Sequence, residues 1–195
     1  MNNIKIKKVG VVGSGIMGSR IACHLANVGL EVILLDVCPK ELNQKEKKLG
    51  KKIKDKDVRN RIVNESLLKA VKSKPSPLFT KKNINKIKTG NLKENLNLLS
   101  SVDWIIEAVV ENLEIKKKVY DSIEKHRKKE TIISTNTSGI PISFISKGRS
   151  ENFKKKFLGT HFFNPPRYLR LLEIIPGKKT DKNIINFFMR FGSLV

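Results

Sequence analysis

The stretch from Lys7 to Asp36, KKVGVVGSGIMGSRIACHLANVGLEVILLD, predicts a strand, a glycine turn, a helix and a second strand. Val9–Val12 is a short apolar run rich in β-branched residues, which is typical of a buried parallel strand. Glu31–Leu35 is the expected second strand. The stretch therefore predicts a βαβ unit that opens with a glycine-rich turn.

The turn GSGIMG fits the spacing G-x-G-x-x-G, and the expected helix starts inside it. Gly13 would permit the tight turn, Gly15 would let backbone N–H groups approach a pyrophosphate, and Gly18 would let helix and strand pack closely. The positive end of the helix dipole favours phosphates at the same place. Asp36 closes the second strand, where a carboxylate can accept hydrogen bonds from ribose hydroxyls and repel the 2′-phosphate of NADP. The sequence thus predicts a dinucleotide site that prefers NAD.

The chain of 195 residues is long enough for one domain with a single core, and its formal net charge is +22. Clustered lysines and arginines would suit nucleic-acid binding, because they release counterions from phosphates. These lysines are spread along the chain without interleaved aromatic residues, and Asn and Ile are also abundant. We therefore interpret the positive charge as a feature of a lysine-rich proteome, as in organisms with A/T-rich codons, and we expect no nucleic-acid partner. Some of the lysines are expected to face an anionic ligand.

The two cysteines, Cys23 and Cys38, match neither a C-x-x-C motif nor a metal-ligand spacing. This usage favours a reducing, cytoplasmic setting and predicts no metal site. The basic N-terminal segment is not followed by the apolar run of a signal peptide, and no apolar stretch is long enough to cross a bilayer. We expect no membrane partner.

A long polar segment, about residues 39–91, follows the second strand. Its sparse apolar residues predict two lysine-rich helices, stopped by Pro75 and Pro77. The segment is too long for a simple connection, so it is expected to project as a helical arm. It could be a solvated helical face or a basic arm over the phosphates of a large substrate, and the sequence leaves both open.

Strands and helices alternate through the rest of the chain. Strands are expected at 86–89, 102–110, 131–135, 157–163 and 169–175, with helices at 92–99, 113–126 and from Asp181 to about 191. Asp181 is a suitable N-cap, Gly192 a suitable stop, and 193–195 resemble the start of a further strand. The pattern predicts an α/β, Rossmann-type fold, with a doubly wound, mostly parallel sheet, an antiparallel edge and a helical insertion after the second strand.

Ligands of such sheets bind beyond the carboxyl ends of the strands. Polar clusters follow three expected strands there, namely Glu111–Asn112, Asn136–Gly139 and His161–Asn164. Thr137 and Ser138 could instead cap a helix beginning near Pro141, although such a cap would also present a hydroxyl to the site. We interpret His24, within the first helix, and His126, at a helix end, as structural.

The spacing of His161 and Glu173 has a geometric consequence. The loop between their strands is too short for a parallel crossover, so the two strands should be antiparallel neighbours. A turn centred on Arg167 would place His161 opposite Glu173, with Cβ atoms about 5 Å apart. A histidine oriented by a carboxylate suits a general base, whereas a shift of register would leave only a surface pair.

The segments GSGIMG, IIEAVVENLEIKKKV, STNTSGIPI and GTHFFNPPRYLRLLEII together strongly resemble the 3-hydroxyacyl-CoA dehydrogenases of fatty-acid β-oxidation, above all the bacterial multifunctional type. The resemblance implies reversible oxidation of L-3-hydroxyacyl-CoA to 3-oxoacyl-CoA with NAD. It implies that His161 is the catalytic base, that Glu173 orients it, and that Ser138 bonds the substrate oxygen. The residues implied to bind NAD are Gly13, Gly15, Ile16, Met17, Gly18, Asp36, Ala108, Val109, Glu111, Lys116, Ser138 and Asn164.

The resemblance also sets limits. Gly139 stands where many members have a second serine, so no hydroxyl role is implied there. In the family a helical domain follows, which supplies an asparagine, much of the acyl pocket and the dimer contacts. We interpret residues 1–195 as the NAD-binding domain alone, expected to bind NAD(H) but to turn over acyl-CoA poorly without the helical domain or a second subunit. The complete protein is expected to be a homo-oligomer.

Two other functions remain open from the sequence. A 3-hydroxyacid-type NAD(P) dehydrogenase shares the G-x-G-x-M-G turn but relies on a catalytic lysine. A basic Rossmann protein could also bind nucleic acid without catalysis, which a steep salt dependence of duplex binding would reveal.

Overall fold

The computed structural model describes residues 4–192. Its strands are β1 Lys8–Val12, β2 Glu31–Asp36, β3 Ile87–Asn91, β4 Trp104–Glu107, β5 Ile132–Thr135, β6 Phe157–Phe162 and β7 Leu172–Pro176. Its α-helices are α1 Ile16–Asn27, α2 Gln44–Lys48, α3 Lys56–Arg59, α4 Arg61–Lys72, α5 Leu113–His126, α6 Ile142–Ser146, α7 Glu151–Lys156 and α8 Lys182–Phe191. Two 3-10 helices are η1 Lys81–Lys86 and η2 Leu96–Ser101.

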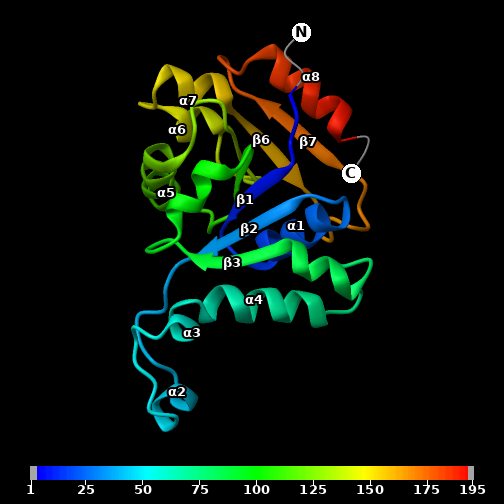
Figure 1. The fold of residues 1–195 in the computed structure, drawn as a ribbon. Coiled ribbons are helices and arrows are strands. Elements are labelled where there is room, and N and C mark those ends of the chain that lie inside the picture. The colour runs from blue at the N-terminus through cyan, green and yellow to red at the C-terminus, as the bar shows by residue number, and fades with distance from the viewer. Residues whose placement is uncertain (1–3, 193–195) are drawn as a thin grey trace.

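The seven strands form one sheet in the order β3-β2-β1-β4-β5-β6-β7, with helices on both faces (Figure 1). Every neighbouring pair is parallel except β6 and β7, which are antiparallel. The order of the strands reverses beside β1, which is where ligands of such sheets bind. The expected Rossmann-type fold, with its antiparallel edge and helical insertion, is confirmed.

Two hydrophobic cores flank the sheet, because neighbouring residues of a strand point to opposite faces. One core lies against α1, α4 and α8, and the other against α5, α6 and α7. Along β1, Val9 and Val11 belong to the first core and Val12 to the second. Burial on both faces explains why β1 and β2 carry continuous apolar runs, Val9–Val12 and Val32–Leu35, that do not alternate with polar residues.

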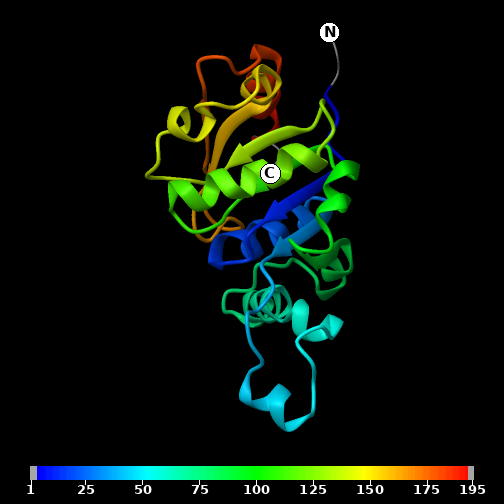
Figure 2. The same ribbon diagram turned by 90° about the vertical axis from the view of Figure 1, so that its left-hand side faces the viewer.

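The insertion between β2 and β3 contains three α-helices, not the two expected from the sequence. Helix α2 lies farthest from the sheet in both ribbon views (Figures 1 and 2), whereas α4 contacts α1, β2 and β3. Val63, Leu67 and Ala70 of α4 recur at helical spacing and are buried. The part that projects is therefore the α2 end, and α4 belongs to the body of the domain.

Two strands are shorter than predicted by two residues or more. The strand expected at 102–110 ends at Glu107, because the backbone N–H of Val109 turns back to donate to the Glu107 carboxylate. The strand expected at 169–175 begins only at Leu172, because the preceding residues close a turn of their own. The turn after β4 carries three candidate site residues, Ala108, Val109 and Glu111.

The helices predicted after the insertion agree with the structure more closely than the helices predicted within it. Helix α5 has the predicted bounds, and the Asn112 side chain caps it by accepting from the N–H of Ile115 at 3.0 Å. The helix expected at 92–99 forms as the 3-10 helix η2, which starts later. Helix α8 begins after the Asp181 cap, as predicted. The strand expected at 193–195 falls outside the described residues.

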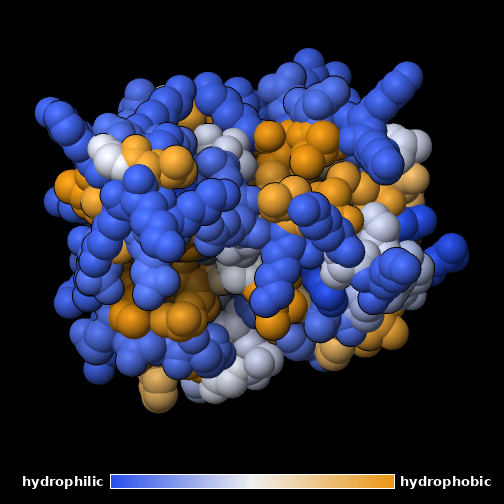
Figure 3. Space-filling view, turned by 90° about the horizontal axis from the view of Figure 1, so that it is seen from below, coloured by the Kyte–Doolittle hydropathy of each residue, from blue (hydrophilic) through white to orange (hydrophobic). Residues whose placement is uncertain are grey.

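The surface agrees with the lysine-rich composition. The face seen from below is mostly hydrophilic, and its hydrophobic patches are separated by polar side chains (Figure 3). None of the helices within residues 4–192 is long and apolar enough to cross a membrane.

Candidate active site

The glycine turn lies at the carboxyl end of β1, and two of its glycines are required by the fold. Gly13 has a φ of +98°, and a Cβ there would lie 2.6 Å from the carbonyl oxygen of Ala108. A Cβ on Gly18 would lie 1.8 Å from the carbonyl oxygen of Gly13. The tight turn and the close packing of helix on strand thus need both residues to be glycine.

Gly15 has different surroundings. It is exposed, and a Cβ there would meet no atom within 4 Å, so the packing of the domain does not require a glycine. Ile16 beside it is 72% exposed, whereas Met17 packs partly against the core. Open space over a backbone at the start of a helix is what a phosphate group needs in order to approach the N–H groups. The residues present here therefore fit the pyrophosphate of a dinucleotide.

The Asp36 carboxylate is held in place by the turn itself. Its Oδ2 accepts from the backbone N–H of Ser14 at 2.6 Å and from the Ser14 hydroxyl at 2.5 Å, and its Oδ1 accepts from the N–H of Val37 at 2.6 Å. Ser14 is fully buried and Asp36 is half-buried, so an ordered carboxylate remains accessible at the end of β2. Ser14 had no role in the sequence-based prediction.

Replacing Asp36 by asparagine should weaken NADH binding about tenfold, since hydrogen bonds to a charged acceptor are among the stronger ones. NADPH binding should fall less or improve, because the variant no longer repels a 2′-phosphate. Titrations of both nucleotides check this. Glu31→Gln, at the opposite end of the same strand, is the control, and equal losses for both nucleotides in Asp36→Asn would contradict the prediction.

A buried ionic cluster follows β4. Glu107 Oε1 accepts from Lys116 Nζ and from the N–H of Val109, both at 2.8 Å. Lys116 Nζ also lies 3.3 Å from Glu111 Oε2. The side chains of Glu107 and Lys116 are 0% and 1% exposed, whereas that of Glu111 is 43% exposed. Both Glu111 and Lys116 were predicted to bind NAD. The Glu111 side chain reaches the surface, whereas the Lys116 side chain is buried beneath it.

The turn after β5 carries Ser138, which is exposed. The Glu111 carboxylate accepts from the hydroxyl of Thr137 and, at 3.0 Å, from the N–H of Gly139, so it holds the residues on both sides of Ser138. The alternative that Thr137 and Ser138 cap a helix is wrong. The N-cap of α6 is Pro141, without a side-chain cap, because the hydroxyl of Thr137 is used within the turn.

Burial raises the pKa of the Glu111 carboxyl, but hydrogen bonds from Thr137 and Gly139 and the charge of Lys116 outweigh this and leave the pKa lowered from 4.5. A lowered carboxyl pKa stabilises the fold above the unfolded-state value, and the contribution is lost as the pH falls through the folded-state value.

We therefore expect wild type to be more stable than Glu111→Gln near neutral pH, with a difference that shrinks as the pH falls below 4.5. Denaturant titrations at a series of pH values measure this difference. Glu114→Gln changes the charge of an exposed residue in the first turn of α5, three residues after Glu111, and serves as the control. A difference that stays constant through the acid range would contradict the expectation.

The predicted register of the antiparallel edge is confirmed, since His161 lies directly opposite Glu173. His161 Nδ1 is 2.8 Å from Glu173 Oε2, and the imidazole also contacts the ring of Phe163, with centroids 4.5 Å apart. With Nδ1–H donating to the carboxylate, Nε2 keeps its lone pair. This arrangement can accept a proton from a bound hydroxyl group.

Two asparagines connect this edge to the rest of the site. Asn136 Oδ1 accepts from the N–H of Phe162 at 2.9 Å, which ties the Ser138 turn to the end of β6. Asn164 Oδ1 accepts from Arg20 Nη1 at 2.5 Å, which ties the loop after β6 to helix α1. The segments on both sides of His161 are therefore bonded to the Ser138 turn and to the helix that follows the glycine turn.

The other two histidines lie in structural positions. His24 is buried within α1, its ring 6.1 Å from that of Phe162 in an edge-on contact. His126 Nδ1 lies 2.8 Å from the carbonyl oxygen of Ser122 at the end of α5. Both agree with the structural interpretation of the sequence.

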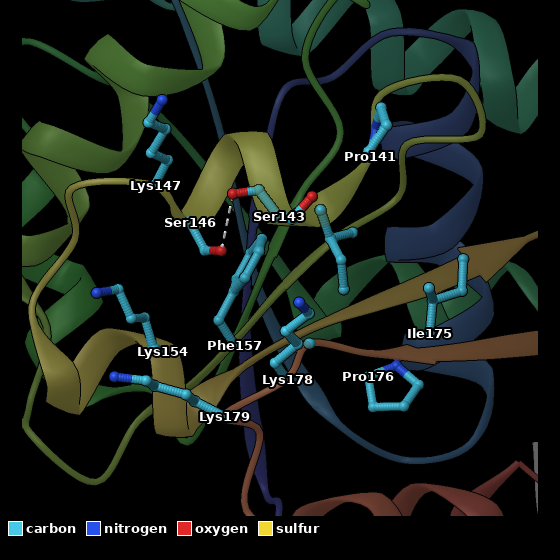
Figure 4. Close-up of a pocket in the computed structure, with 12 residues that line it drawn as sticks. Pro141, Ser143, Ser146, Lys147, Lys154, Phe157, Ile175, Pro176, Lys178 and Lys179 are labelled. Carbon is cyan, nitrogen blue, oxygen red and sulfur yellow. Dashed lines mark hydrogen bonds between the residues drawn. The ribbon is translucent and has the colours of Figure 1, made fainter.

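A cavity of about 520 Å³ opens between α6, α7 and the β6–β7 hairpin (Figure 4). Phe157, Ile175 and Pro176 contribute its apolar part. Four lysines stand around it, namely Lys147, Lys154, Lys178 and Lys179. Ile175 follows Glu173 by two residues on the same face of β7, so the cavity begins about 7 Å along the strand from the histidine–glutamate pair.

The sequence analysis missed Glu107, Ser14 and Arg20. Glu107 carried a signal, because it is the acidic residue inside the otherwise apolar run WIIEAVV. A charge within a buried strand requires partners, and these could have been sought. Ser14 and Arg20 carried no comparable signal, since their partners are distant in the chain.

The reversal of strand order at β1, the glycine turn and the carboxylate at the end of β2 define a dinucleotide-binding Rossmann domain. Residues 8–194 match the family model described as "3-hydroxyacyl-CoA dehydrogenase, NAD binding domain". The chain belongs to this family.

Relatives extend the comparison. The chain is 50% identical over 190 residues to a "Probable 3-hydroxyacyl-CoA dehydrogenase" of Bacillus subtilis (strain 168), covering 97% of this chain and 24% of that protein. It is 42% identical over 171 residues to a "Putative fatty acid oxidation complex trifunctional enzyme" of Rickettsia felis, covering 88% of this chain and 22% of that protein. The chain thus spans about a quarter of the length of these two relatives.

Among solved structures, the chain resembles (S)-3-hydroxybutyryl-CoA dehydrogenase from Ralstonia eutropha, with a TM-score of 0.70 and 28% identity. The match covers 97% of this chain and 61% of that one.

Proposed function

We propose that the chain provides the NAD site and the catalytic base of an enzyme that oxidises L-3-hydroxyacyl-CoA to 3-oxoacyl-CoA in fatty-acid oxidation. The observation that carries the proposal is the contact between His161 and Glu173 near the carboxyl end of β6, the end of the parallel strands at which the glycine turn also lies. The names of the Bacillus and Rickettsia relatives support the same reaction and its place in fatty-acid oxidation.

In the proposed reaction, NAD supplies the acceptor for the hydride that leaves C3 of the substrate. Nε2 of His161 takes the proton of the C3 hydroxyl, and the Glu173 carboxylate, 2.8 Å from Nδ1, stabilises the imidazolium that results. The exposed Ser138 hydroxyl donates a hydrogen bond to the substrate oxygen as its bond order changes. Gly15 and Asp36 bind the pyrophosphate and the adenosine ribose of the cofactor.

The proposed substrate has an apolar acyl chain and an anionic CoA part. The apolar cavity that begins at Ile175, beside the histidine–glutamate pair, supports the first feature. The lysine-rich insertion supports the second, since its α2 end projects from the body and carries Lys45, Lys47 and Lys48. The names of the relatives also support assembly into a larger multifunctional protein, and the helical domain or a second subunit is proposed to complete the acyl pocket.

Acetoacetyl-CoA reduction tests this function. The protein, in excess over substrate and loaded with NADH, should oxidise NADH in a single slow turnover that is faster with acetoacetyl-CoA than with acetoacetate. The slow rate follows from a substrate pocket that this chain supplies only in part. Loss of NADH at the same rate in both reactions, or at the rate of buffer alone, would overturn the proposal.

A further inference from the structure

Glu107 is a fully buried acid in the central strand β4 whose side chain none of the proposed chemistry uses. Besides Lys116 and Val109 on Oε1, it accepts on Oε2 from the hydroxyls of Thr135 at 2.7 Å and Tyr120 at 3.1 Å. Burying an ion without partners is strongly unfavourable. Four donors, from α5, β5 and the turn after β4, therefore fix this carboxylate.

One route leads from Glu107 to the Ser138 turn through β5. The Thr135 hydroxyl that donates to Glu107 also accepts from the backbone N–H of Thr137 at 3.3 Å. Thr137 directly precedes Ser138. The Thr135 side chain therefore links the Glu107 carboxylate directly to Thr137, the residue at which the Ser138 turn begins.

A second route leads through α5. Lys116 is bonded to Glu107 on its inner side and to Glu111 on its outer side, and Glu111 in turn accepts from Gly139. Exposure rises along this route from 0% at Glu107 and 1% at Lys116 to 43% at Glu111. The ammonium group of Lys116 therefore links the buried Glu107 to the surface residue Glu111, which binds Gly139 on the far side of Ser138.

We propose that Glu107 is a positioning residue, which fixes the turn that carries Ser138 from both sides through Thr135 and through Lys116 and Glu111. The role of Ser138 toward substrate rests on the proposed function, whereas the coupling between Glu107 and the turn does not. In the unliganded chain, loss of the Glu107 charge releases the turn although Glu107 touches neither Ser138 nor Gly139 directly.

Amide hydrogen exchange of Gly139, followed by NMR in the whole chain without cofactor, tests the coupling. Glu107→Gln should speed this exchange about tenfold, the effect of losing one strong hydrogen bond. Amides in β1 and in α8 should change much less. Glu114→Gln, an exposed charge change on α5, should leave Gly139 exchange as in wild type.

A double-mutant cycle separates this coupling from a general loss of stability. Glu111→Ala removes the acceptor of the Gly139 amide and leaves only the route through Thr135, so adding Glu107→Gln to it should raise Gly139 exchange much less than Glu107→Gln alone does. If Glu107→Gln is too unstable to purify, Thr135→Val interrupts the other route without changing charge. The N–H of Thr137 should then exchange faster.

Unchanged exchange at Gly139 in Glu107→Gln, a uniform rise across the chain, or full additivity in the cycle would overturn the inference. These outcomes leave the proposed function untouched, because they are measured without cofactor. Conversely, failure of wild type to bind NADH would refute the proposed function and leave the coupling standing.

Discussion

His161→Ala is expected to slow oxidation of bound NADH by acetoacetyl-CoA about 10²- to 10⁴-fold, the usual contribution of a general acid–base residue. In the reduction direction the imidazolium gives its proton to the forming alkoxide, and alanine has no proton to give. NADH affinity should change little, because His161 lies at the β6–β7 edge, apart from the glycine turn. Single-turnover loss of NADH absorbance, with protein in excess, measures the rate.

Glu173→Gln should cause a smaller loss than His161→Ala, since the amide can still accept from Nδ1 but cannot stabilise the imidazolium. His126→Gln, at the far end of α5, is the matched control and should behave as wild type. Turnover in His161→Ala at the wild-type rate would show that another group moves the proton.

Substitutions in the glycine turn should separate the effect on the stability of the fold from the effect on NADH binding. Gly15→Ala should leave the free energy of unfolding within about 0.5 kcal/mol of wild type, because its Cβ meets no atom within 4 Å. It should weaken NADH binding at least about tenfold, since the methyl group occupies the space that the phosphates need. Denaturant titration and NADH titration measure the two quantities.

Gly18→Ala should show the opposite balance. Its Cβ would lie 1.8 Å from the carbonyl oxygen of Gly13, so strand and helix must separate. A destabilisation of about 3 kcal/mol is expected, with loss of NADH binding as a consequence. Unchanged NADH affinity in a stable Gly15→Ala protein would show that the phosphates of the cofactor do not bind at this turn.

Much of the fold was predictable because local patterns and sheet topology agree. The apolar residues of Val9–Val12 and Glu31–Leu35, with the glycine turn and helix between them, correctly predicted the parallel pair β1–β2. The antiparallel pairing of β6 and β7 followed from the length of the loop, and the register of His161 and Glu173 followed from a turn centred on Arg167, because side chains in paired strands repeat every two residues. The insertion was harder, since α4 packs on the body through a few apolar residues in a lysine-rich segment.

The contacts that hold the candidate site together were less predictable. The capping alternative for Thr137 failed because its hydroxyl oxygen accepts from the N–H of Ile140, before α6 begins, and the same hydroxyl donates to Glu111, which lies 26 residues earlier in the chain. Ser14 occupies a variable position of the G-x-G-x-x-G motif, so the motif did not predict that this residue fixes Asp36. Hydrogen bonds between distant segments leave no periodic pattern in a sequence, so only the folded chain displays them.

Isothermal titration of the wild-type chain with NADH and then with NADPH tests the central claim most directly. Saturable binding of one NADH per chain, with clearly weaker binding of NADPH, is the predicted result, because we propose that the open turn at Gly15 binds the pyrophosphate and that the fixed carboxylate of Asp36 binds the ribose. Absence of NADH binding by the folded chain, or equal affinity for the two nucleotides, would contradict it.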